Sequence, residues 1–356
     1  MLWAVLVPPR LQPSPSAVVS QDSCAAVSEN ALPSLLKDAV EARRALIDPA
    51  HQSAVRLFNG FTEGCADLVI DLYGETAVFY NYADPPARGD PLVDVAHEAL
   101  RAALPWLHAG LVKTRSSPSD HERRGILIFG QQMTRQIREH GLWYAIDLTL
   151  HQDCSLYLDT RNLRRWAIAH LRDKTIMNAF AYTGSLGVAA LGGGARRVVQ
   201  LDRTRRFLDL AKASCALNGL PVHGQDFVRA DFFRQAGRLR REKQTFDCVF
   251  LDPPYFASSP SGIVDQETGS ARLINKVRPL VAPGGFLVAI NNALYVSGGA
   301  YMRDLETLCT DAHLEIVELI PVPHDFVGLV RVQHAAFITD PAPFNHSTKI
   351  AVLRVL

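Results

Sequence analysis

The feature of the sequence that most restricts its fold is an alternation of short apolar runs with helical patterns, which begins at about residue 161. Between the runs lie stretches such as 203–220, where apolar residues recur at helical intervals before the stop signal Asn218-Gly219. Short buried strands separated by helices are typical of a mostly parallel sheet with helices on both faces. The predicted strands are 175–180, 197–202, 226–231, 246–252, 284–290, 314–320 and 349–356. These seven strands predict one doubly wound, Rossmann-like α/β domain.

A smaller α+β domain is predicted before it. Residues 66–83 favour two short strands around a turn at 73–75, and 91–107 have apolar residues at helical spacing behind a proline. The runs 125–130 and 142–150 resemble further strands. Because 356 residues suffice for two domains, we divide the chain into three parts. These are an extension at 1–54, disordered or partly helical, the small domain at 55–155, and the larger domain at 156–356.

Composition indicates a soluble globular protein. Apolar residues make up 48% and charged residues 21% of the chain, and no apolar run approaches the roughly 20 residues that span a bilayer. The first 20 residues start apolar but lack a basic segment and carry four prolines, so we expect disorder there rather than a secretory signal. Six scattered cysteines without a Cys-x-x-Cys pair favour reduced thiols, a cytoplasmic location and no metal site.

Polar residues follow several of the predicted strands of the larger domain. In doubly wound sheets, ligands bind outside the carboxyl ends of the strands. The residues at these ends are 178–184, Asp202, Asp231, Asp252 and the pair Asn291-Asn292. We therefore expect three carboxylates, an amide pair and a glycine-bearing turn along one edge.

The first three of these strand ends favour a nucleoside ligand. Asp202 is placed to accept hydrogen bonds from ribose hydroxyls, and Asp231 from an adenine amino group, with Phe232 beside the ring. Each aspartate alone could equally cap the following helix. The Gly-x-Gly-x-x-Gly fingerprint is absent after the first strand, which disfavours an NAD oxidoreductase. A nucleoside that needs no phosphate cradle fits all three positions, and S-adenosylmethionine is such a ligand.

Four motifs in order resemble the class I S-adenosylmethionine-dependent methyltransferases of 23S ribosomal RNA, the group with cytosine-C5 (RlmI-like) and guanine-N7 (RlmK-like) enzymes. The motifs are "LYLDTRNLRR", "NAFAYTGSLGVAAL", "VQLDRTRRFLDLAKASCALNGL" and "FDCVFLDPPYF". The resemblance covers roughly residues 55–356. It implies that Tyr182, Thr183 and Gly184 surround the methionine part of the cofactor, that Asp202 holds the ribose, and that Asp231 lies by the adenine. It also implies that 158–161, with Asp159 and Arg161, closes over the site, although Thr160 stands where Gln or His is usual. We include Asn178 and Phe180, at the end of the first strand, among the cofactor-binding residues.

The motif Asp252-Pro253-Pro254-Tyr255 favours a pocket for a flipped base. Two prolines fix the backbone and remove two N–H donors, which leaves carbonyl groups free to face the cleft. A base stacked on Tyr255 or Phe256 would direct an amino edge at Asp252 and at the carbonyl of Leu251 or Pro253. Motifs of this type resemble those of enzymes that methylate a base nitrogen. The alternative is a rigid turn with an aromatic plug.

The chain has no cysteine where a cytosine-C5 enzyme needs one. Carbon 5 of cytosine becomes nucleophilic when a thiolate adds to C6, and the cytosine-C5 relatives have a Ser-Cys-Ser segment after the fifth strand. Here that place holds Asn291 and Asn292, which resembles the guanine-N7 enzymes, and Cys248 fits a small core residue. The asparagines could instead cap the loop. Asn345, His346 and Lys349, before the last strand, are candidates to line the pocket or to form a turn.

These features predict a methyltransferase that acts on RNA at a base nitrogen, guanine N7 or an exocyclic amine. The alternatives are cytosine-C5 methylation and a non-catalytic RNA-binding or assembly protein. Basic clusters at 161–174 and 234–243 could bind RNA phosphates, although ordinary solvent-exposed helix faces have the same composition. The net charge of +1 neither supports nor opposes RNA binding. The cytosine-C5 relatives carry an RNA-binding barrel before the middle domain, whereas some 54 residues precede it here. We therefore expect RNA to bind the middle domain and the methyltransferase face.

Overall fold

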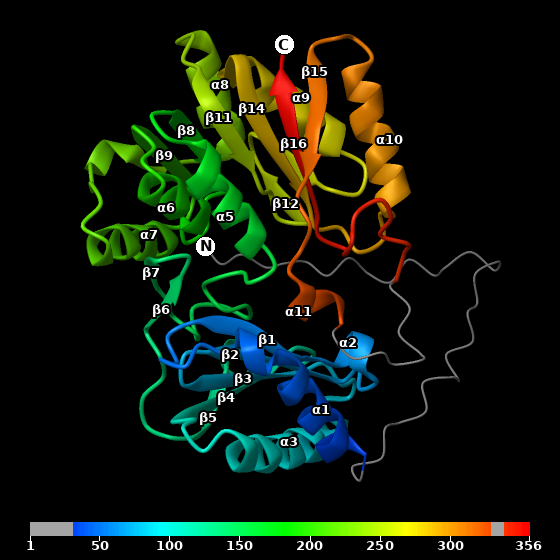
Figure 1. The fold of residues 1–356 in the computed structure, drawn as a ribbon. Helices are drawn as coiled ribbons and strands as arrows, with labels where there is room; N and C mark the ends of the chain where they lie inside the picture. The colour runs from blue at the N-terminus through cyan, green and yellow to red at the C-terminus, as the bar shows by residue number, and fades with distance from the viewer. Residues whose placement is uncertain (1–30, 329–337) are drawn as a thin grey trace, which may run out of the picture.

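The computed structural model describes residues 31–328 and 338–356 (Figure 1). The predictions for the first 20 residues, and most of the predicted extension, lie outside the described residues. Within the described ranges, no helix is long and apolar enough to cross a bilayer.

A seven-stranded sheet forms the larger domain and confirms the predicted fold class. Its strands stand in the order β10-β9-β8-β11-β14-β16-β15. All neighbours are parallel except β16, which lies antiparallel between β14 and β15. Six observed strands fall within two residues of the predicted bounds, and β14 begins three residues earlier. The strands are β8 (Thr175–Ala179), β9 (Arg197–Asp202), β10 (Phe227–Arg229), β11 (Phe246–Leu251), β14 (Val281–Asn291), β15 (Leu314–Leu319) and β16 (Lys349–Val355).

Helices cover both faces of this sheet, as side-chain alternation along the strands requires. Met177 and Ala179 face one layer, formed by α8 (Phe232–Arg241), α9 (Ser270–Val277) and α10 (Gly298–Cys309). Ile176 and Val198 face the other, formed by α5 (Arg161–His170) and α6 (Ser185–Gly192). The helix α7 (Arg205–Leu217) adjoins α6 and the hairpin β6 (Gln136–Glu139) and β7 (Leu142–Ala145).

The small domain is built on a five-stranded sheet with the order β1-β2-β3-β4-β5. Its strands are β1 (Ala54–Asn59), β2 (Leu68–Tyr73), β3 (Thr76–Asn81), β4 (Ala109–Thr114) and β5 (Ile126–Phe129). The predicted turn at 73–75 joins β2 to β3. The helices α1 (Leu32–Arg43) and α3 (Asp90–Ala103) pack together on the sheet, and Leu32 and Leu36 of α1 belong to the same core as Leu57 and Phe79. Shorter helices are α2 (Gly60–Glu63) and α4 (Asp120–Arg124).

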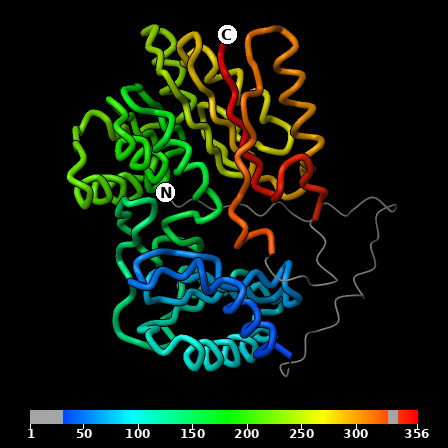
Figure 2. Tube along the Cα trace, viewed as in Figure 1, coloured from blue at the N-terminus to red at the C-terminus, as the bar shows by residue number. Residues whose placement is uncertain are grey.

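A segment of the larger domain reaches into the small one. After β15 the chain forms α11 (His324–Val327), which lies against β1 (Figures 1 and 2). Asp325 of α11 is only 1% exposed. Its carboxylate accepts hydrogen bonds from the Arg56 backbone N–H at 2.9 Å and from both terminal nitrogens of Arg161, at 3.0 and 3.1 Å. The Arg161 guanidinium also donates to the Ala54 carbonyl at 2.9 Å, so one ion pair joins β1, α5 and α11.

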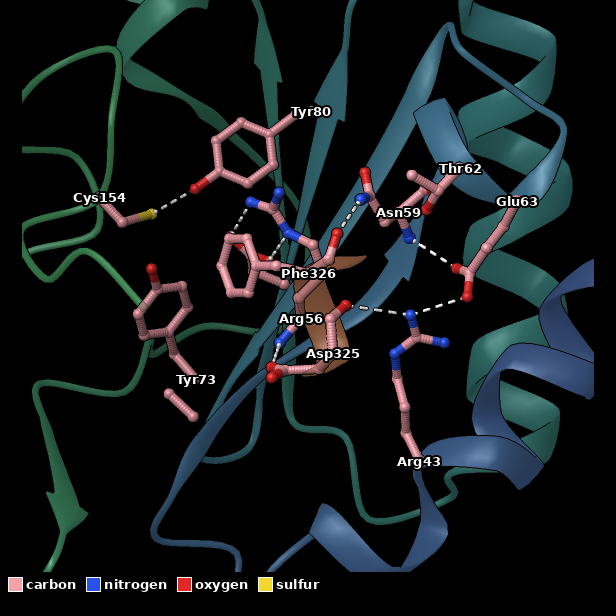
Figure 3. Close-up of polar contacts among 12 residues, drawn as sticks. Arg43, Arg56, Asn59, Thr62, Glu63, Tyr73, Tyr80, Cys154, Asp325 and Phe326 are labelled. Atoms are coloured by element: carbon pink, nitrogen blue, oxygen red, sulfur yellow. Dashed lines mark hydrogen bonds and ion pairs between the residues drawn. The ribbon is translucent and has the colours of Figure 1, made fainter. Parts of the chain in front are cut away.

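Further buried polar contacts surround α11 (Figure 3). Arg43, fully buried at the end of α1, forms an ion pair with Glu63 at 2.7 Å and donates to the Asp325 carbonyl at 3.1 Å. The Asn59 side chain donates to the Phe326 carbonyl at 2.6 Å, and the Arg56 guanidinium lies 4.1 Å from the centre of the Phe326 ring. These contacts attach α11 to the small domain through buried ion pairs and hydrogen bonds.

We predict that Asp325→Ala destabilises the protein strongly. The substitution leaves the buried Arg161 guanidinium and the Arg56 N–H without their acceptor. Removing one partner of a buried ion pair lowers the free energy of unfolding by about 3–5 kcal/mol. Chemical denaturation should show this loss, whereas Asp304→Ala, at an exposed position on α10, should change the free energy of unfolding by less than about 0.5 kcal/mol. Equal stabilities of the two variants would contradict the assigned role of Asp325.

Candidate active site

The loop after β8 turns sharply at the carboxyl edge of the sheet. Phe180, Tyr182 and Gly184 have φ values of 57°, 51° and 74°, in the left-handed region. Residues other than glycine adopt this conformation at an energetic cost, and such strain clusters at functional sites. At Gly184 a Cβ would lie 2.5 Å from the Cβ of Ala211, so a side chain has no room there. The loop leads directly into α6.

Two sets of side-chain hydrogen bonds hold this loop. The Asp202 carboxylate, at the end of β9, accepts from the backbone N–H groups of Tyr182 at 2.9 Å and of Thr204 at 2.8 Å. Burial raises the pKa of Asp202, and these backbone donors counteract part of that effect. Asn178 donates to Gln200 at 2.8 Å, and Gln200 in turn donates to the Gly184 carbonyl at 3.1 Å. Asn178 is therefore placed beneath the loop, as a support for its backbone.

Residues before α5 close one side of the loop. Thr183 donates to the Ser155 carbonyl, and the Tyr182 hydroxyl donates to the Cys154 carbonyl at 3.2 Å. The Tyr182 ring lies 5.2 Å from the ring of Tyr157, whose hydroxyl donates to Asp153 at 3.2 Å. Tyr182 and Thr183 thus join the end of β8 to the segment that leads from the small domain.

The predicted adenine end contains an aromatic pair and a helix cap. The rings of Phe180 and Phe232 lie 4.5 Å apart, and Phe232 is buried. Asp231 caps α8, because its carboxylate accepts from the Arg234 backbone N–H at 3.1 Å, and it lies 3.9 Å from the Arg203 guanidinium. The structure therefore contains the helix-cap alternative for Asp231, and contact with an adenine stays a prediction.

Asp159 and Arg161 face different surroundings although they are two residues apart. Asp159 accepts from the Thr348 hydroxyl at 2.8 Å and acts electrostatically on Asp252 and on His346. Burial lowers the pKa of His346 to about 4, so this imidazole is neutral at neutral pH. Arg161 is hydrogen-bonded to Asp325 and Ala54 at the domain junction, which places its guanidinium in a structural ion pair.

The loop after β11 presents a half-buried carboxyl group and two exposed aromatic rings. Burial, with a contribution from Asp159, raises the pKa of Asp252 to about 7. Tyr255 and Phe256 are exposed, and the Tyr255 hydroxyl donates to Glu267 at 2.8 Å. The Pro253 carbonyl, predicted to face a base, accepts a hydrogen bond from the side-chain amide of Gln266. Among the described residues, none donates a hydrogen bond to the Asp252 carboxylate, whereas the Pro253 carbonyl already has a donor.

Gln266 connects the two loops of the predicted base pocket, and sequence reasoning missed it. This residue is 1% exposed. It donates to the Pro253 carbonyl and accepts from the Asn292 backbone N–H at 3.0 Å. Its own carbonyl accepts from the Asn291 side chain at 2.9 Å. The sequence around it, "DQETGS", is polar and resembles an exposed turn, so no pattern marks the residue as buried.

The predicted pair Asn291-Asn292 has two separate roles in the structure. The Asn291 side chain is buried and hydrogen-bonded to Gln266, to Ser270 at 2.8 Å and to the Ala293 N–H at 3.0 Å, which fits the loop-capping alternative. The Asn292 side-chain oxygen is buried and has no hydrogen-bond partner among the described residues. A buried acceptor without a donor is costly, so Asn292 is suited to receive one from a ligand.

Lys349, the first residue of β16, contacts the loop after β14, and Asn345 contacts the segment after β15. Lys349 is fully buried and donates to the carbonyls of Ala293 at 3.0 Å and Ser347 at 2.6 Å, and burial lowers its pKa to about 8. Asn345 forms two hydrogen bonds with the backbone of Val322, at 2.8 and 2.9 Å. Lys349 and Asn345 therefore hold the backbone of neighbouring segments through these hydrogen bonds.

None of the described cysteines has the properties of a nucleophile. Burial raises the pKa of the thiols of Cys65, Cys154 and Cys215 to about 11, and it raises those of Cys248 and Cys309 as well. A nucleophilic cysteine needs a lowered pKa. Cys24 lies outside the described residues. In the described part of the chain, no group of three or more His, Cys, Asp or Glu residues is arranged to hold a metal ion.

Comparisons with known proteins agree on one family. A model of S-adenosylmethionine-dependent methyltransferases matches residues 124–337. Ribosomal RNA large subunit methyltransferase I of Aeromonas hydrophila subsp. hydrophila is 30% identical over 298 residues, which cover 82% of this chain and 74% of that protein. Ribosomal RNA large subunit methyltransferase K/L of Syntrophotalea carbinolica is 34% identical over 206 residues, 57% of this chain and 28% of that protein.

Solved structures share the fold. SMU.776, crystallised with SAH, is similar with a TM-score of 0.80 at 23% identity, over 92% of this chain and 82% of that one. A SAM-dependent methyltransferase from Agrobacterium tumefaciens is similar with a TM-score of 0.56 at 16% identity, over 81% of this chain and 87% of that one. These likenesses confirm the architecture of the larger domain.

We predict that Gln266→Leu loosens both pocket loops together. The substitution keeps most of the side-chain volume and removes the bonds to Pro253 and Asn292, and leaving such buried groups unpaired costs about 1–3 kcal/mol. Hydrogen exchange followed by mass spectrometry should show faster exchange in the loops 252–256 and 290–295. Gln244→Leu, at an exposed position before β11, should leave both unchanged. Unaltered exchange in the Gln266 variant would show that the loops do not depend on this side chain.

Proposed function

Since the chain belongs to the S-adenosylmethionine-dependent methyltransferase family, we propose that it methylates a base nitrogen of large-subunit ribosomal RNA. The relatives named for ribosomal RNA methylation support the choice of substrate. The observation that carries the choice of atom is the linked pair of loops at Asp252 and Asn292, with no activated thiol among the described cysteines. Guanine N7 is the first candidate and an exocyclic amine the second.

The residues at the strand ends suit the cofactor. When bound, S-adenosylmethionine supplies an electrophilic methyl group on a sulfonium. The Asp202 carboxylate would accept hydrogen bonds from the ribose hydroxyls, and the loop 180–184, with left-handed residues at Phe180, Tyr182 and Gly184, would enclose the methionine part. The Phe180 and Phe232 rings would border the adenine. Asp202, with two backbone donors already bound, is oriented before the ligand arrives.

On the substrate side, the chain needs to orient a base rather than to activate it chemically. Guanine N7 has an available lone pair and can attack the methyl group directly, so alignment and exclusion of water suffice. The acceptors Asp252 and Asn292 could receive the N–H groups of the guanine edge opposite N7. If the target is an exocyclic amine, the Asp252 carboxylate is placed to accept the proton that leaves after transfer, because its pKa lies near neutrality.

Cytosine-C5 methylation remains the main alternative, because the relatives include methyltransferases I. That reaction requires a thiolate at C6 of the base, and the described thiols have raised pKa values. A covalent adduct with RNA containing 5-fluorocytidine would support this alternative and contradict nitrogen methylation. A non-catalytic RNA-binding role would be supported if methyl transfer to protein-free large-subunit ribosomal RNA were absent.

We predict that Asp252→Ala lowers methyl transfer at least about 100-fold and changes cofactor affinity only a few-fold, because Asp252 lies at the substrate end. Asp202→Ala should weaken cofactor binding at least about 10-fold, which is the loss of about one charge-assisted hydrogen bond. Calorimetry measures binding, and transfer of tritiated methyl groups to protein-free large-subunit ribosomal RNA measures activity. Asp209→Ala, at an exposed position on α7, is the control. Full activity of the Asp252 variant would refute the base pocket.

We predict that kcat/KM rises with pH around the pKa of Asp252. That pKa is raised to about 7, so the ionised acceptor is scarce below this value and predominates above it. The rate should increase between about pH 6 and pH 8 and then level off. Asp252→Asn should remove this step in the pH profile, measured with saturating cofactor. A wild-type profile that is flat over this range would contradict a role for the ionised carboxylate.

A further inference from the structure

A short hairpin beside the predicted base pocket exposes apolar side chains. Directly after Tyr255 the chain forms β12 (Phe256–Ser259) and β13 (Gly262–Asp265), an antiparallel pair in which Ser258 lies opposite Ile263. Because side chains alternate along strands, Phe256 and Ile263 share one face of the pair. Phe256 is 50% exposed and Ile263 is 48% exposed. The hairpin therefore exposes two apolar side chains, on a face that also carries Ser258 and Asp265, in the segment that follows Asp252.

The other face of the hairpin fixes it to the larger domain. Val264 is buried in the main core, with Ala257 packed against it. At Gly262 a Cβ would lie 2.7 Å from the ring of Phe233, so the hairpin backbone rests directly on α8. The Arg272 guanidinium, on α9, donates to the Ile263 carbonyl at 2.6 Å. The exposed face is thus held in place, and a ligand that binds it orders little additional chain.

Two more aromatic rings extend this face toward the pocket. Tyr255 and Tyr295 come from the loops after β11 and β14, which Gln266 joins through its hydrogen bonds to the Pro253 carbonyl and the Asn292 N–H. Tyr295, in the loop after β14, is 66% exposed, and Tyr255 is 40% exposed. We call Tyr255, Phe256, Ile263 and Tyr295 the hairpin platform.

Arginines lie on the α8 side of the platform. Arg234 follows Phe233 in α8 and is exposed. The exposed Arg229 donates to the Arg203 carbonyl at 3.2 Å, and the Arg203 guanidinium lies 3.9 Å from Asp231, the cap of α8. On this side three arginines accompany one carboxylate, Asp231, whereas two carboxylates, Asp265 and Glu267, lie beside Tyr255 and Phe256 at the other side of the platform.

We propose that the hairpin platform binds unpaired nucleotides next to the target base, with Arg229 and Arg234 contacting their phosphates. Exposed aromatic rings beside arginines are the combination that binds single-stranded nucleic acid, because every base can stack and every phosphate is negative. Aromatic residues and arginine are also enriched in protein–protein interfaces, so association with a protein is measured as the competing outcome of the test. The proposal rests on the proposed function, since it assumes that the substrate is RNA. It adds that the RNA beside the target base is single-stranded and lies on the hairpin platform.

The test measures binding of a fluorescent short single-stranded oligoribonucleotide of mixed sequence, and of its duplex, by anisotropy. Phe256→Ala should weaken single-strand binding about five- to a hundredfold, the range for loss of one stacked base, and Phe256→Trp should restore it. Ile263→Ser should weaken binding, whereas Ile126→Ser, a matched exposed isoleucine on β5 of the small domain, should not. Arg229→Gln and Arg234→Gln should each reduce the slope of log K against log salt by about 0.7.

Several outcomes would overturn the proposal. They are wild-type binding that is absent or no stronger for the single strand than for the duplex, equal affinities of Phe256→Ala and wild type, and failure of Phe256→Trp to restore binding. A shift in molar mass of Phe256→Ala in light scattering would assign the platform to protein association instead. Methyl transfer to protein-free large-subunit ribosomal RNA is measured in parallel. If the wild type methylates this RNA and Phe256→Ala binds the single strand as tightly as the wild type, the platform proposal is refuted and the proposed function stands. If single-strand binding depends on the platform but the wild type transfers no methyl group, the proposed function is refuted and the platform proposal stands.

Discussion

The buried ion pair between Asp325 and Arg161, both of the larger domain, joins the two domains through hydrogen bonds to the backbone of β1 in the small domain. Its carboxylate comes from a connection between the last two strands of the larger domain in chain order, and its guanidinium from the first turn of α5. Both charges have lost most of their contact with water, so each needs the other at hydrogen-bonding distance. Because Asp159 lies only two residues before Arg161, the junction and the predicted base pocket share one short segment. A change in the domain arrangement would therefore move a carboxylate that acts on Asp252.

The site consists of two halves that are stabilised differently. At the predicted cofactor half, backbone groups of the loop 180–184 are held by Asp202 and Gln200, whose side chains come from the neighbouring strand β9. At the predicted substrate half, the loops after β11 and β14 are joined by Gln266, which comes from outside the sheet. The first half is thus set by the sheet itself. The second depends on the segment between β11 and α9, which also forms the hairpin β12–β13 and makes none of the contacts that hold the loop 180–184.

Sequence reasoning predicted the sheet well because its strands are short apolar runs bounded by turn residues, and their period is visible without any tertiary information. The same reasoning placed Asp202, Asp252 and Asn292 at one edge, because parallel strands end together. It did not find Gln266 or α11, since a polar residue buried by distant segments leaves no local pattern. Asp231 shows the same limit of sequence reasoning. An aspartate at a strand end has the same sequence pattern whether its carboxylate caps the next helix or binds a ligand.

The position of β16 has a consequence for the order of events during synthesis. This strand lies between β14 and β15 and pairs with both along nearly its whole length, yet it follows both in the chain. While the chain emerges from the ribosome, β14 has an open edge and β15 has no sheet neighbour until residues 349–355 are available. The small domain can already have folded by then. The larger domain thus closes its central sheet late, and an exposed edge of β14 is the surface that a nascent chain must keep from pairing elsewhere.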